Sequence, residues 1–271
     1  MRKSKLVKGF TLIELLVVIA IIALLLSIVM PALARVKNVG KRIACLNTMR
    51  QWGVGAMAYA SEFKDALPWE GDKTDLAFNF TRSDWWANAI PPRVAQEPYK
   101  KLSEEERVPM PPDKSMFICP SAKAPESAPY PITGKPWYRF FFCYVWNSDI
   151  NEGRTKDNVD DVDPIRLFKL KQTSDTIFML EMRTSDEELP EDDPYYGEEL
   201  NRHRADWKRF AARHDRGSQK GGNMVFCDGH ADFVSNEYAT TSRQGNRGSD
   251  YNNDDWNKSD LIWNPFGPAY D

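Results

Sequence analysis

The sequence predicts an α+β protein in which one long N-terminal helix packs against an antiparallel β-sheet. Three observations support this prediction: an unbroken apolar segment near the N-terminus, a helical apolar pattern that continues it, and several strand-like segments in the second half. The predicted parts are a basic leader at residues 1–9, a transmembrane helix at 10–34, a continuation of that helix at 35–67, and a globular α+β ectodomain at 68–271.

The apolar segment runs from Phe10 to Ala34 and contains a single charged residue, Glu14. As a helix it would be about 37 Å long, enough to cross a hydrocarbon core of about 30 Å. Its Leu, Ile and Val side chains contribute roughly −4 to −8 kcal/mol to insertion, whereas one carboxylate costs about +3 kcal/mol or less. We therefore predict that this segment spans a membrane.

The flanking charges predict the orientation of this helix. Residues 1–9 contain Arg2, Lys3, Lys5 and Lys8 and no acid, so we expect the N-terminus in the cytoplasm and the ectodomain outside. The alternative is a secretory signal cleaved at Ala32-Leu33-Ala34. That alternative needs an apolar core of about 7–15 residues, shorter than this one, and has no use for an embedded acid.

The stretch Lys8-Gly9-Phe10-Thr11-Leu12-Ile13-Glu14 resembles the cleavage and methylation signal of bacterial type IV prepilins and type II secretion pseudopilins. The resemblance lies in the basic leader, the Gly before the cut, the Phe after it, the Glu four residues further on and the apolar run. It implies a pilin-like fold in the cell inner membrane. It also implies that a prepilin peptidase cuts between Gly9 and Phe10, removes residues 1–9 and methylates the new amine of Phe10.

Two residues of the apolar helix have predicted roles. A charged Glu14 side chain has an unfavourable free energy in a membrane unless it is paired. We therefore expect it to pair with the Phe10 amine of a neighbouring subunit during filament assembly. The alternative for Glu14 is a carboxylate that reaches the membrane interface by itself. Pro31 lies where many pilins kink this helix, and it removes the hydrogen bond to the Ser27 carbonyl.

The helical pattern continues beyond the membrane segment. Apolar or small residues recur at spacings of mainly three and four from Val36 to Phe63, and Leu67-Pro68 is the expected stop. The small residues Gly53 and Gly55 would let another element pack closely against this part of the helix.

Four segments after residue 115 have sequence patterns typical of β-strands. Trp137–Trp146 is aromatic throughout and predicts a strand that is covered on both faces, and Thr176–Met182 predicts a second strand. Met116–Cys119 predicts a short strand that Pro120 ends. Asn223–Val234 predicts a hairpin in which Asp228-Gly229 forms a type I′ turn. Together they indicate a sheet of about four or five strands.

The four cysteines allow two disulfides in an oxidising compartment, with three connectivities. We favour Cys143 with Cys227, because both lie in strong strand patterns, and hence Cys45 with Cys119. Free buried cysteines are the alternative. The spacings lack a Cys-x-x-Cys pair, so a zinc site is not expected from them.

The segment from Arg213-His214 to His230 resembles the C-terminal signature of a large subfamily of prepilin-like proteins, in which a His is followed by Asp-Gly. Here the signature residues are His214, Asp228, Gly229 and His230. A metal site formed by His214, Asp228 and His230 is one interpretation. The favoured alternative is a hairpin whose Asp caps backbone amides and whose His lies in the core.

Calcium is the one cofactor with candidate ligands in the loops. Asp160, Asp161 and Asp163 form one acidic group, and Asn252–Asp255 forms another. Some secretion pseudopilins bind calcium in a C-terminal loop, but neither group has the spacing of an EF-hand. We therefore favour solvated acidic loops and expect no cofactor.

The predicted function is structural. A net charge of −3 argues against nucleic acid as the main ligand, and the motifs of Ser hydrolases, zinc proteases and phosphate-binding loops are absent, so we predict no enzyme. The resemblance implies a pilin-like or pseudopilin subunit of a type II secretion or type IV pilus-like filament. Its implied partners are the membrane, the prepilin peptidase, other subunits and an assembly platform. The alternative is a membrane-anchored extracytoplasmic binding protein that does not polymerise.

Overall fold

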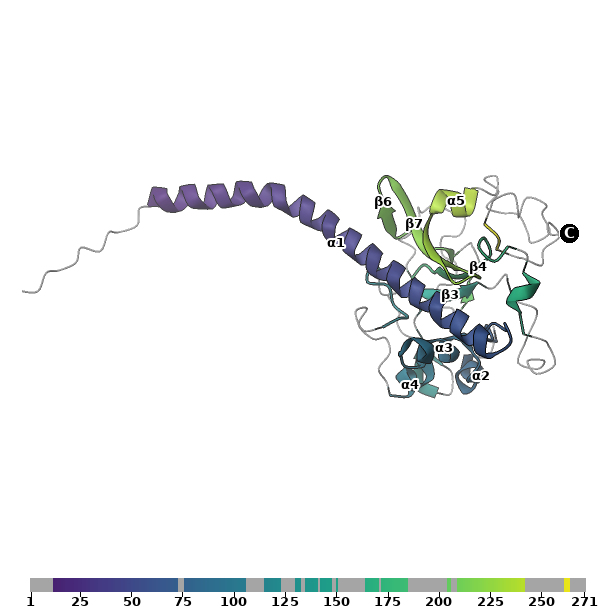
Figure 1. Ribbon diagram of the computed structural model, residues 1–271. Helices are drawn as coiled ribbons and strands as arrows, with labels where there is room; N and C mark the ends of the chain where they lie inside the picture. Colours follow the sequence, from purple (N-terminus) through teal and green to yellow (C-terminus); the bar gives the residue numbers. More distant parts are fainter. Residues whose placement is uncertain are drawn as a thin grey trace, which may run out of the picture. The chain divides into compact units, whose positions relative to one another are not determined.

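The long helix α1 spans Leu12–Glu62 in the computed structural model (Figure 1). The structure describes residues 12–72, 76–105, 115–122, 130–132, 135–140, 142–147, 150, 164–170, 172–184, 204–205, 209–241 and 261–263. The chain forms two units, Met1–Gly40 and Lys41–Asp271.

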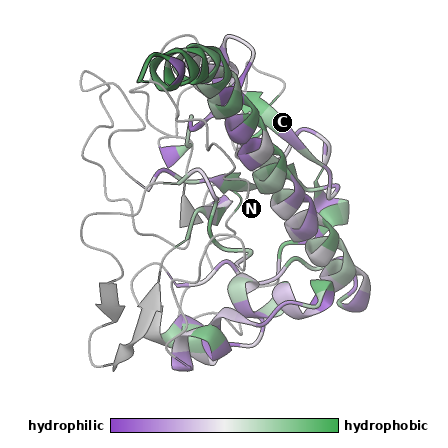
Figure 2. Ribbon diagram, turned by 90° about the vertical axis from the view of Figure 1, so that its left-hand side faces the viewer, coloured by the Kyte–Doolittle hydropathy of each residue, from purple (hydrophilic) through white to green (hydrophobic). Residues whose placement is uncertain are grey.

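In the first unit, α1 is apolar on all sides. The consecutive side chains from Leu15 to Ile19 are all large, apolar and exposed. Successive residues advance by about 100° around a helix, so these five cover its whole circumference. The first turns of α1 are accordingly almost uniformly hydrophobic in Figure 2. By length and composition this helix can cross a membrane.

In the second unit, α1 buries one face. The buried side chains Cys45, Met49, Trp52, Ala56 and Tyr59 follow one another at spacings of three and four, which places them on one stripe of the helix. The helix ends at Glu62, five residues before the expected boundary at residue 67. Lys64 and Asp65 have positive φ angles of 55° and 62°, and the amide of Asp65 donates to the Ala60 carbonyl at 2.9 Å.

Short helices follow α1 along the chain. They are α2 (Leu76–Thr81), α3 (Trp86–Ala89), the 3₁₀ helix η1 (Pro91–Val94) and α4 (Tyr99–Glu104). Further on come the 3₁₀ helix η4 (Leu167–Lys169) and α5 (Asn236–Thr241). Each of these helices has six residues or fewer, which is too short to give a clear helical periodicity in the sequence.

The described strands form two sheets. The hairpin of β1 (Tyr130–Ile132) and β2 (Lys135–Phe140) forms a two-stranded sheet. The larger sheet has six strands in the order β5-β3-β4-β7-β6, with β8 paired to β7. Its strands are β3 (Tyr144–Asn147), β4 (Ile177–Glu181), β5 (Arg204–Ala205), β6 (His214–Arg216), β7 (Gln219–Phe226) and β8 (Ala231–Ser235).

The larger sheet is antiparallel apart from the short β3–β5 pair. β3 and β4 are buried at every position, so both faces of the sheet centre are covered. The predicted fold class, a long apolar N-terminal helix with an antiparallel sheet in a pilin-like α+β arrangement, is confirmed.

The part of α1 in the second unit lies between the sheet and the helices α2, α3 and α4 (Figure 1). A Cβ atom on Gly53 would be 2.1 Å from the carbonyl oxygen of Gly229, in the β7–β8 loop, and one on Gly55 would be 2.6 Å from Cγ2 of Ile90. The two glycines are two residues apart, and so they face opposite sides of the helix. The close packing predicted for these small residues is confirmed on both sides.

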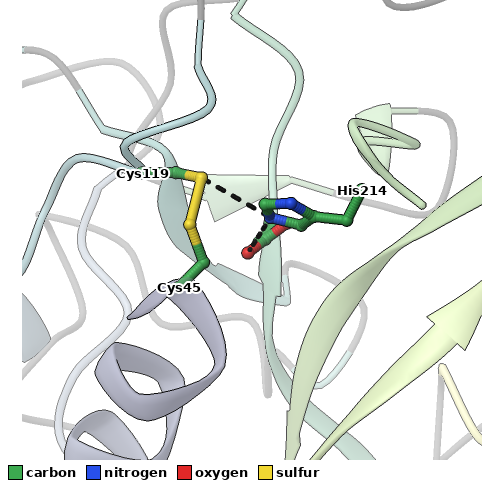
Figure 3. Close-up of side chains that lie close together, drawn as sticks. Cys45, Cys119 and His214 are labelled. Carbon is green, nitrogen blue, oxygen red and sulfur yellow. Dashed lines mark hydrogen bonds and ion pairs between the residues drawn. A yellow bond between two sulfur atoms is a disulfide. The ribbon is translucent and has the colours of Figure 1, made fainter. Parts of the chain in front are cut away.

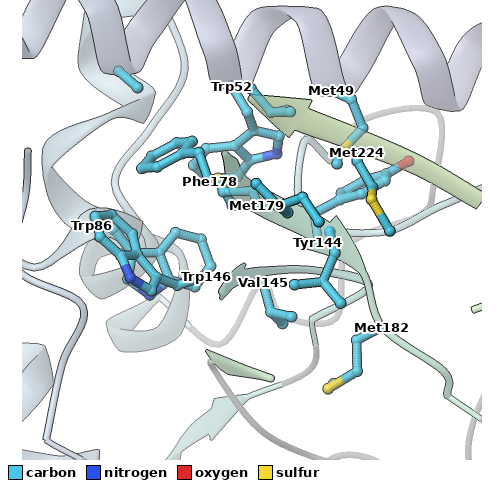
Figure 4. Close-up of a cluster of buried hydrophobic side chains, with 14 of the residues drawn as sticks. Met49, Trp52, Trp86, Tyr144, Val145, Trp146, Phe178, Met179, Met182 and Met224 are labelled. Atoms are coloured by element: carbon cyan, nitrogen blue, oxygen red, sulfur yellow. The ribbon is translucent and has the colours of Figure 1, made fainter. Parts of the chain in front are cut away.

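Aromatic and Met side chains fill the core. Met49 and Trp52 extend from α1 towards Met179 and Met224 of the sheet (Figure 4). The Trp52 indole donates to the Met116 carbonyl at 2.8 Å. Phe142 packs among other rings, with its centroid 4.4 Å from that of Tyr99.

Two strand predictions are wrong for one shared reason. The segment Trp137–Trp146 is split between β2 and β3, and Met116–Cys119 is not a strand. The amide of Cys143 donates to the Phe117 carbonyl at 2.8 Å, and the Phe142 ring enters the aromatic core. The backbone groups of these two segments therefore form hydrogen bonds with each other and with the Trp52 side chain instead of with a neighbouring strand. As a result, β2 and β3 belong to different sheets.

The predicted β4 strand and the β7–β8 hairpin are confirmed, but the type I′ turn is wrong. Four residues, Cys227–His230, separate the strands, and Gly229 has a φ of 89° whereas Asp228 is not among the residues with positive φ. The Gly229 amide donates to the Phe226 carbonyl at 2.9 Å. A longer loop with one left-handed Gly replaces the two-residue turn.

We expect Gly53→Ala to destabilise the folded ectodomain by about 1–3 kcal/mol, because the new methyl group meets the backbone of Gly229. The midpoint of thermal unfolding, followed by near-UV circular dichroism of the full chain in detergent, should fall by several degrees. Gly40→Ala is the matched control in the same helix, since nothing lies within 4 Å of its Cβ position. An equal effect of both substitutions would contradict the close helix–loop contact.

Candidate functional site

Glu14 lies in the first turn of α1, within the N-terminal signal. Its neighbours Ile13 and Leu15 are exposed and apolar, so the carboxylate interrupts a continuous apolar surface. A helix N-terminus favours a negative charge, which lowers the cost of this position. The predicted cleavage residues Gly9 and Phe10 lie outside the described residues.

Pro31 lies inside α1 without ending it. The ring leaves no N–H for the Ser27 carbonyl, and the Ser27 hydroxyl itself donates to the Leu24 carbonyl at 2.7 Å. The kink at Pro31 remains a prediction.

The second candidate site surrounds the disulfide between Cys45 and Cys119. Cys45 comes from the buried face of α1 and Cys119 from the segment that follows α4, and their Cα atoms are 5.6 Å apart. This pairing was predicted and is confirmed. The bond closes a sequence separation of 74 residues, and loop-closure entropy alone gives a stabilisation of about 4 kcal/mol.

The favoured pairing of Cys143 with Cys227 is wrong, because both are free and buried. The Cys143 carbonyl accepts a hydrogen bond from the amide of Met182, the residue that follows β4. The Cys227 amide donates to the carbonyl of Thr176, the residue that precedes β4. Opposite ends of this strand lie about 20 Å apart, far beyond the roughly 7 Å that a disulfide allows between Cα atoms. Burial, followed by the charge of Asp228, raises the pKa of the Cys227 thiol, which stays neutral.

His214, the first residue of β6, points towards the disulfide (Figure 3). Its Nε2 atom is 3.5 Å from Sγ of Cys119 and 3.1 Å and 3.2 Å from the two carboxylate oxygens of Glu181. Glu181 is the last residue of β4, and its Oε1 accepts a hydrogen bond from Nδ2 of Asn223 at 2.8 Å. All these side chains are buried, so the cluster is closed to solvent.

Glu181 is ionised despite its burial. Desolvation on its own would raise the pKa of Glu181, but the charge and hydrogen bond of His214, the charge of Arg213 and the hydrogen bond of Asn223 lower it below the ordinary value. Burial, together with the Glu181 charge, raises the pKa of the neighbouring Tyr144 phenol. The cluster therefore contains one carboxylate beside a neutral phenol.

Sequence reasoning missed Glu181, although a signal was present. Glu181 is the single acid in the strand Thr176–Met182, just as Glu14 is the single acid in the apolar helix. A lone acid in a buried strand needs a partner, and the partner here is the His of the C-terminal signature.

The structure separates the residues of that signature. His214 pairs with Gly221 near one end of β7, whereas Asp228, Gly229 and His230 form the loop at the other end, about 16 Å further along the strand. Asp228 Oδ1 accepts the amide of His230 at 3.0 Å and lies 2.6 Å from its Nδ1. The metal site of His214, Asp228 and His230 is therefore wrong, and Asp228 caps a backbone amide as in the alternative.

The two acidic groups considered for calcium, Asp160, Asp161 and Asp163 and the segment Asn252–Asp255, lie outside the described residues. Among the described residues, the group of ligand-type side chains that lie close together is Cys45, Cys119, Glu181 and His214. Their ligand atoms all lie within 4.8 Å of one another.

We expect Glu181→Gln to lower the free energy of unfolding by about 2–4 kcal/mol at neutral pH, because it removes the buried carboxylate that His214, Arg213 and Asn223 stabilise. Since the pKa of Glu181 is lower in the folded state, its contribution is complete above the ordinary value of 4.5 and is lost as the pH falls below it. Denaturant unfolding of both forms from about pH 7 to about pH 3 should show the difference shrinking.

Glu62→Gln is the control for this experiment, because Glu62 pairs with Arg93 at the surface. We expect it to change the free energy of unfolding by no more than about 0.5 kcal/mol at any pH. A difference between wild type and Glu181→Gln that grows towards acid pH would contradict the assignment of Glu181 as a stabilised buried carboxylate.

The comparisons with known proteins concern the N-terminal segment. No curated protein and no solved structure matches the chain significantly. Residues 4–30 match the family model of the prokaryotic N-terminal methylation motif. The chain therefore carries a prepilin-type methylation motif at the start of its apolar helix, as type IV pilin-like and pseudopilin-like proteins do.

Proposed function

We propose that this protein is a structural pilin-like or pseudopilin subunit that assembles through its N-terminal helix into a type II secretion or type IV pilus-like filament. One observation carries the proposal: directly after the methylation motif, α1 exposes apolar side chains around its whole circumference and contains one acid in its first turn. An exposed apolar surface of this size requires an apolar partner.

Two partners can cover this surface in turn. Before assembly, the lipid hydrocarbon covers the helix, whose length suffices to cross it. In a filament, the same helices of neighbouring subunits cover one another. Glu14 supplies the register, because cleavage before Phe10 creates a cationic amine one turn away from it, and a carboxylate in an apolar bundle is stable only when paired.

The proposed topology has the N-terminus in the cytoplasm, a single pass through the inner membrane and the ectodomain in the periplasm or outside the cell. The basic residues before Gly9 support this orientation. The Cys45–Cys119 disulfide also supports it, because disulfides persist in oxidising compartments.

The proposed partners are the prepilin peptidase, other pilin or pseudopilin subunits and an assembly platform. The same motif supports a structural rather than an enzymatic role. Nucleic acid is not a proposed partner, because the net charge of −3 does not favour phosphate binding.

We expect the mature protein, isolated from membranes, to begin at an N-methylated Phe10. Intact-mass and N-terminal peptide spectrometry measure this directly. Gly9→Val should abolish cleavage and leave the leader attached, whereas Lys8→Arg, which keeps the leader basic, should be processed normally. A mature chain that begins at Arg35 would refute retention of the helix and with it the filament.

We expect Glu14→Val to insert and be processed normally but to fail in assembly, because the partner amine loses its carboxylate. Site-specific photo-cross-linking within α1 should give ladders of subunits for the wild type and monomers for Glu14→Val. Leu16→Val is the matched control, since it changes a neighbouring apolar side chain without touching the acid, and it should retain the ladder. Monomers in the wild type would favour the alternative, an anchored binding protein that does not polymerise.

A further inference from the structure

The buried cluster around the disulfide has the composition of a metal site. Cys45, Cys119, Glu181 and His214 offer two sulfurs, one carboxylate and one imidazole nitrogen, and all four ligand atoms lie within 4.8 Å of one another. The geometry points to a redox-controlled zinc site: the oxidised chain holds the Cys45–Cys119 disulfide, and the reduced chain binds one Zn²⁺ through the same two sulfurs, His214 Nε2 and a Glu181 oxygen.

The distances between these atoms agree with tetrahedral coordination. With the usual zinc–ligand distances, sulfur and nitrogen ligands of one zinc lie about 3.5 Å apart, and nitrogen and oxygen ligands lie about 3.3 Å apart. Here Sγ of Cys119 lies 3.5 Å from His214 Nε2, and the two Glu181 oxygens lie 3.1 Å and 3.2 Å from the same nitrogen. The distances from His214 Nε2 to the sulfur and to the carboxylate oxygens therefore match those of a tetrahedral zinc site.

The imidazole nitrogen faces more acceptors than it can satisfy. A single N–H on Nε2 can point at one acceptor well, yet Cys119 Sγ and both Glu181 oxygens surround it. Within the described part of the chain, Oε2 of Glu181 is buried and accepts no hydrogen bond. A cation at the centre of the cluster would contact Cys119 Sγ, His214 Nε2 and Oε2 of Glu181 at once.

The surroundings suit a bound zinc ion. The Asn223 amide donates to Oε1 of Glu181, which holds the carboxylate in place and leaves Oε2 for the metal. Two thiolates and one carboxylate around Zn²⁺ give a net charge of −1, and Arg213 interacts electrostatically with Glu181 to offset it. Thiolate and imidazole ligands select zinc over calcium or magnesium.

The two states exclude each other because they use the same sulfurs. A thiol reductant transfers two electrons and two protons to the disulfide, giving two cysteine thiols while the reductant becomes a disulfide. Zn²⁺ then replaces the two thiol protons, which leave to solvent, and the Nε2 proton of His214, which passes to Nδ1 or to solvent. The two sulfurs move apart to about 3.8 Å. A disulfide oxidant takes up two electrons from the two thiolates, re-forms the Cys45–Cys119 bond while it is itself reduced to two thiols, and so releases the ion. Either state joins α1 to the segment after α4, so zinc would secure the ectodomain before the disulfide forms.

The test uses the full-length chain in detergent, reduced with a water-soluble phosphine under nitrogen and compared with the oxidised chain. Zinc is titrated against a chromophoric chelator, and Co²⁺ replaces zinc for absorption spectroscopy. We expect one zinc per reduced chain and none per oxidised chain. Co²⁺ should give thiolate charge-transfer bands and the intense visible bands of tetrahedral coordination.

His214→Gln should weaken zinc binding by at least about 10-fold and change the Co²⁺ spectrum, since it removes one ligand. His230→Gln is the matched control, because His230 is exposed in the β7–β8 loop, and it should bind as the parent does. The proposal is overturned if the reduced parent takes up no zinc or unfolds with zinc present. It is equally overturned if reduced, folded His214→Gln binds zinc and Co²⁺ as the parent does. The comparison of oxidised and reduced parent decides the question even where a variant fails to fold.

Discussion

A carboxylate placed among apolar side chains needs a positive partner, and this requirement governs both candidate sites of the protein. Glu181 stands at the end of a fully buried strand, and the chain itself supplies His214, Arg213 and Asn223 around it. Glu14 stands in an exposed apolar helix, and the filament proposal gives it a partner from another subunit. An unpaired carboxylate in apolar surroundings is energetically unfavourable, so Glu181 forms its contacts within the ectodomain. We propose that the same cost directs the pairing of Glu14 during assembly.

Helix α1 changes character along its length. From Leu12 to Val39 its large apolar side chains are exposed, whereas from Cys45 onwards one stripe is buried against protein. The glycines on two sides of this second part allow the β7–β8 loop and the residues around Ile90 to approach closely. A helix that packs against protein on two sides has little room for side chains at the contact points, and glycines at these points allow the close approach.

The cross-link at Cys45 secures this second part of α1 at the centre of a buried polar cluster. Because the cluster is closed to solvent, it is suited to holding structure rather than to turning over a substrate. That property agrees with a structural role for the protein. Under the zinc proposal, the redox state would decide whether a disulfide or a metal ion forms this cross-link.

The sequence by itself determined the features that depend on neighbours along the chain. The apolar run, the methylation motif, the helical spacing beyond Val36 and the β7–β8 hairpin were all readable, because each is a local pattern in residue type. The Cys45–Cys119 pair was also predicted, but only as a consequence of a second pairing that proved wrong.

The tertiary structure alone decided which distant groups meet. The β-strand order places Cys143 and Cys227 at opposite ends of β4, and it brings Glu181 and His214 together from β4 and β6, across 33 positions of sequence. It also interrupts the aromatic segment at Phe142, whose ring enters a core built from three other parts of the chain. The physical reason is that strand pairing and core packing bring together residues that are far apart in the sequence. Residue type and local spacing do not specify which of these distant residues meet.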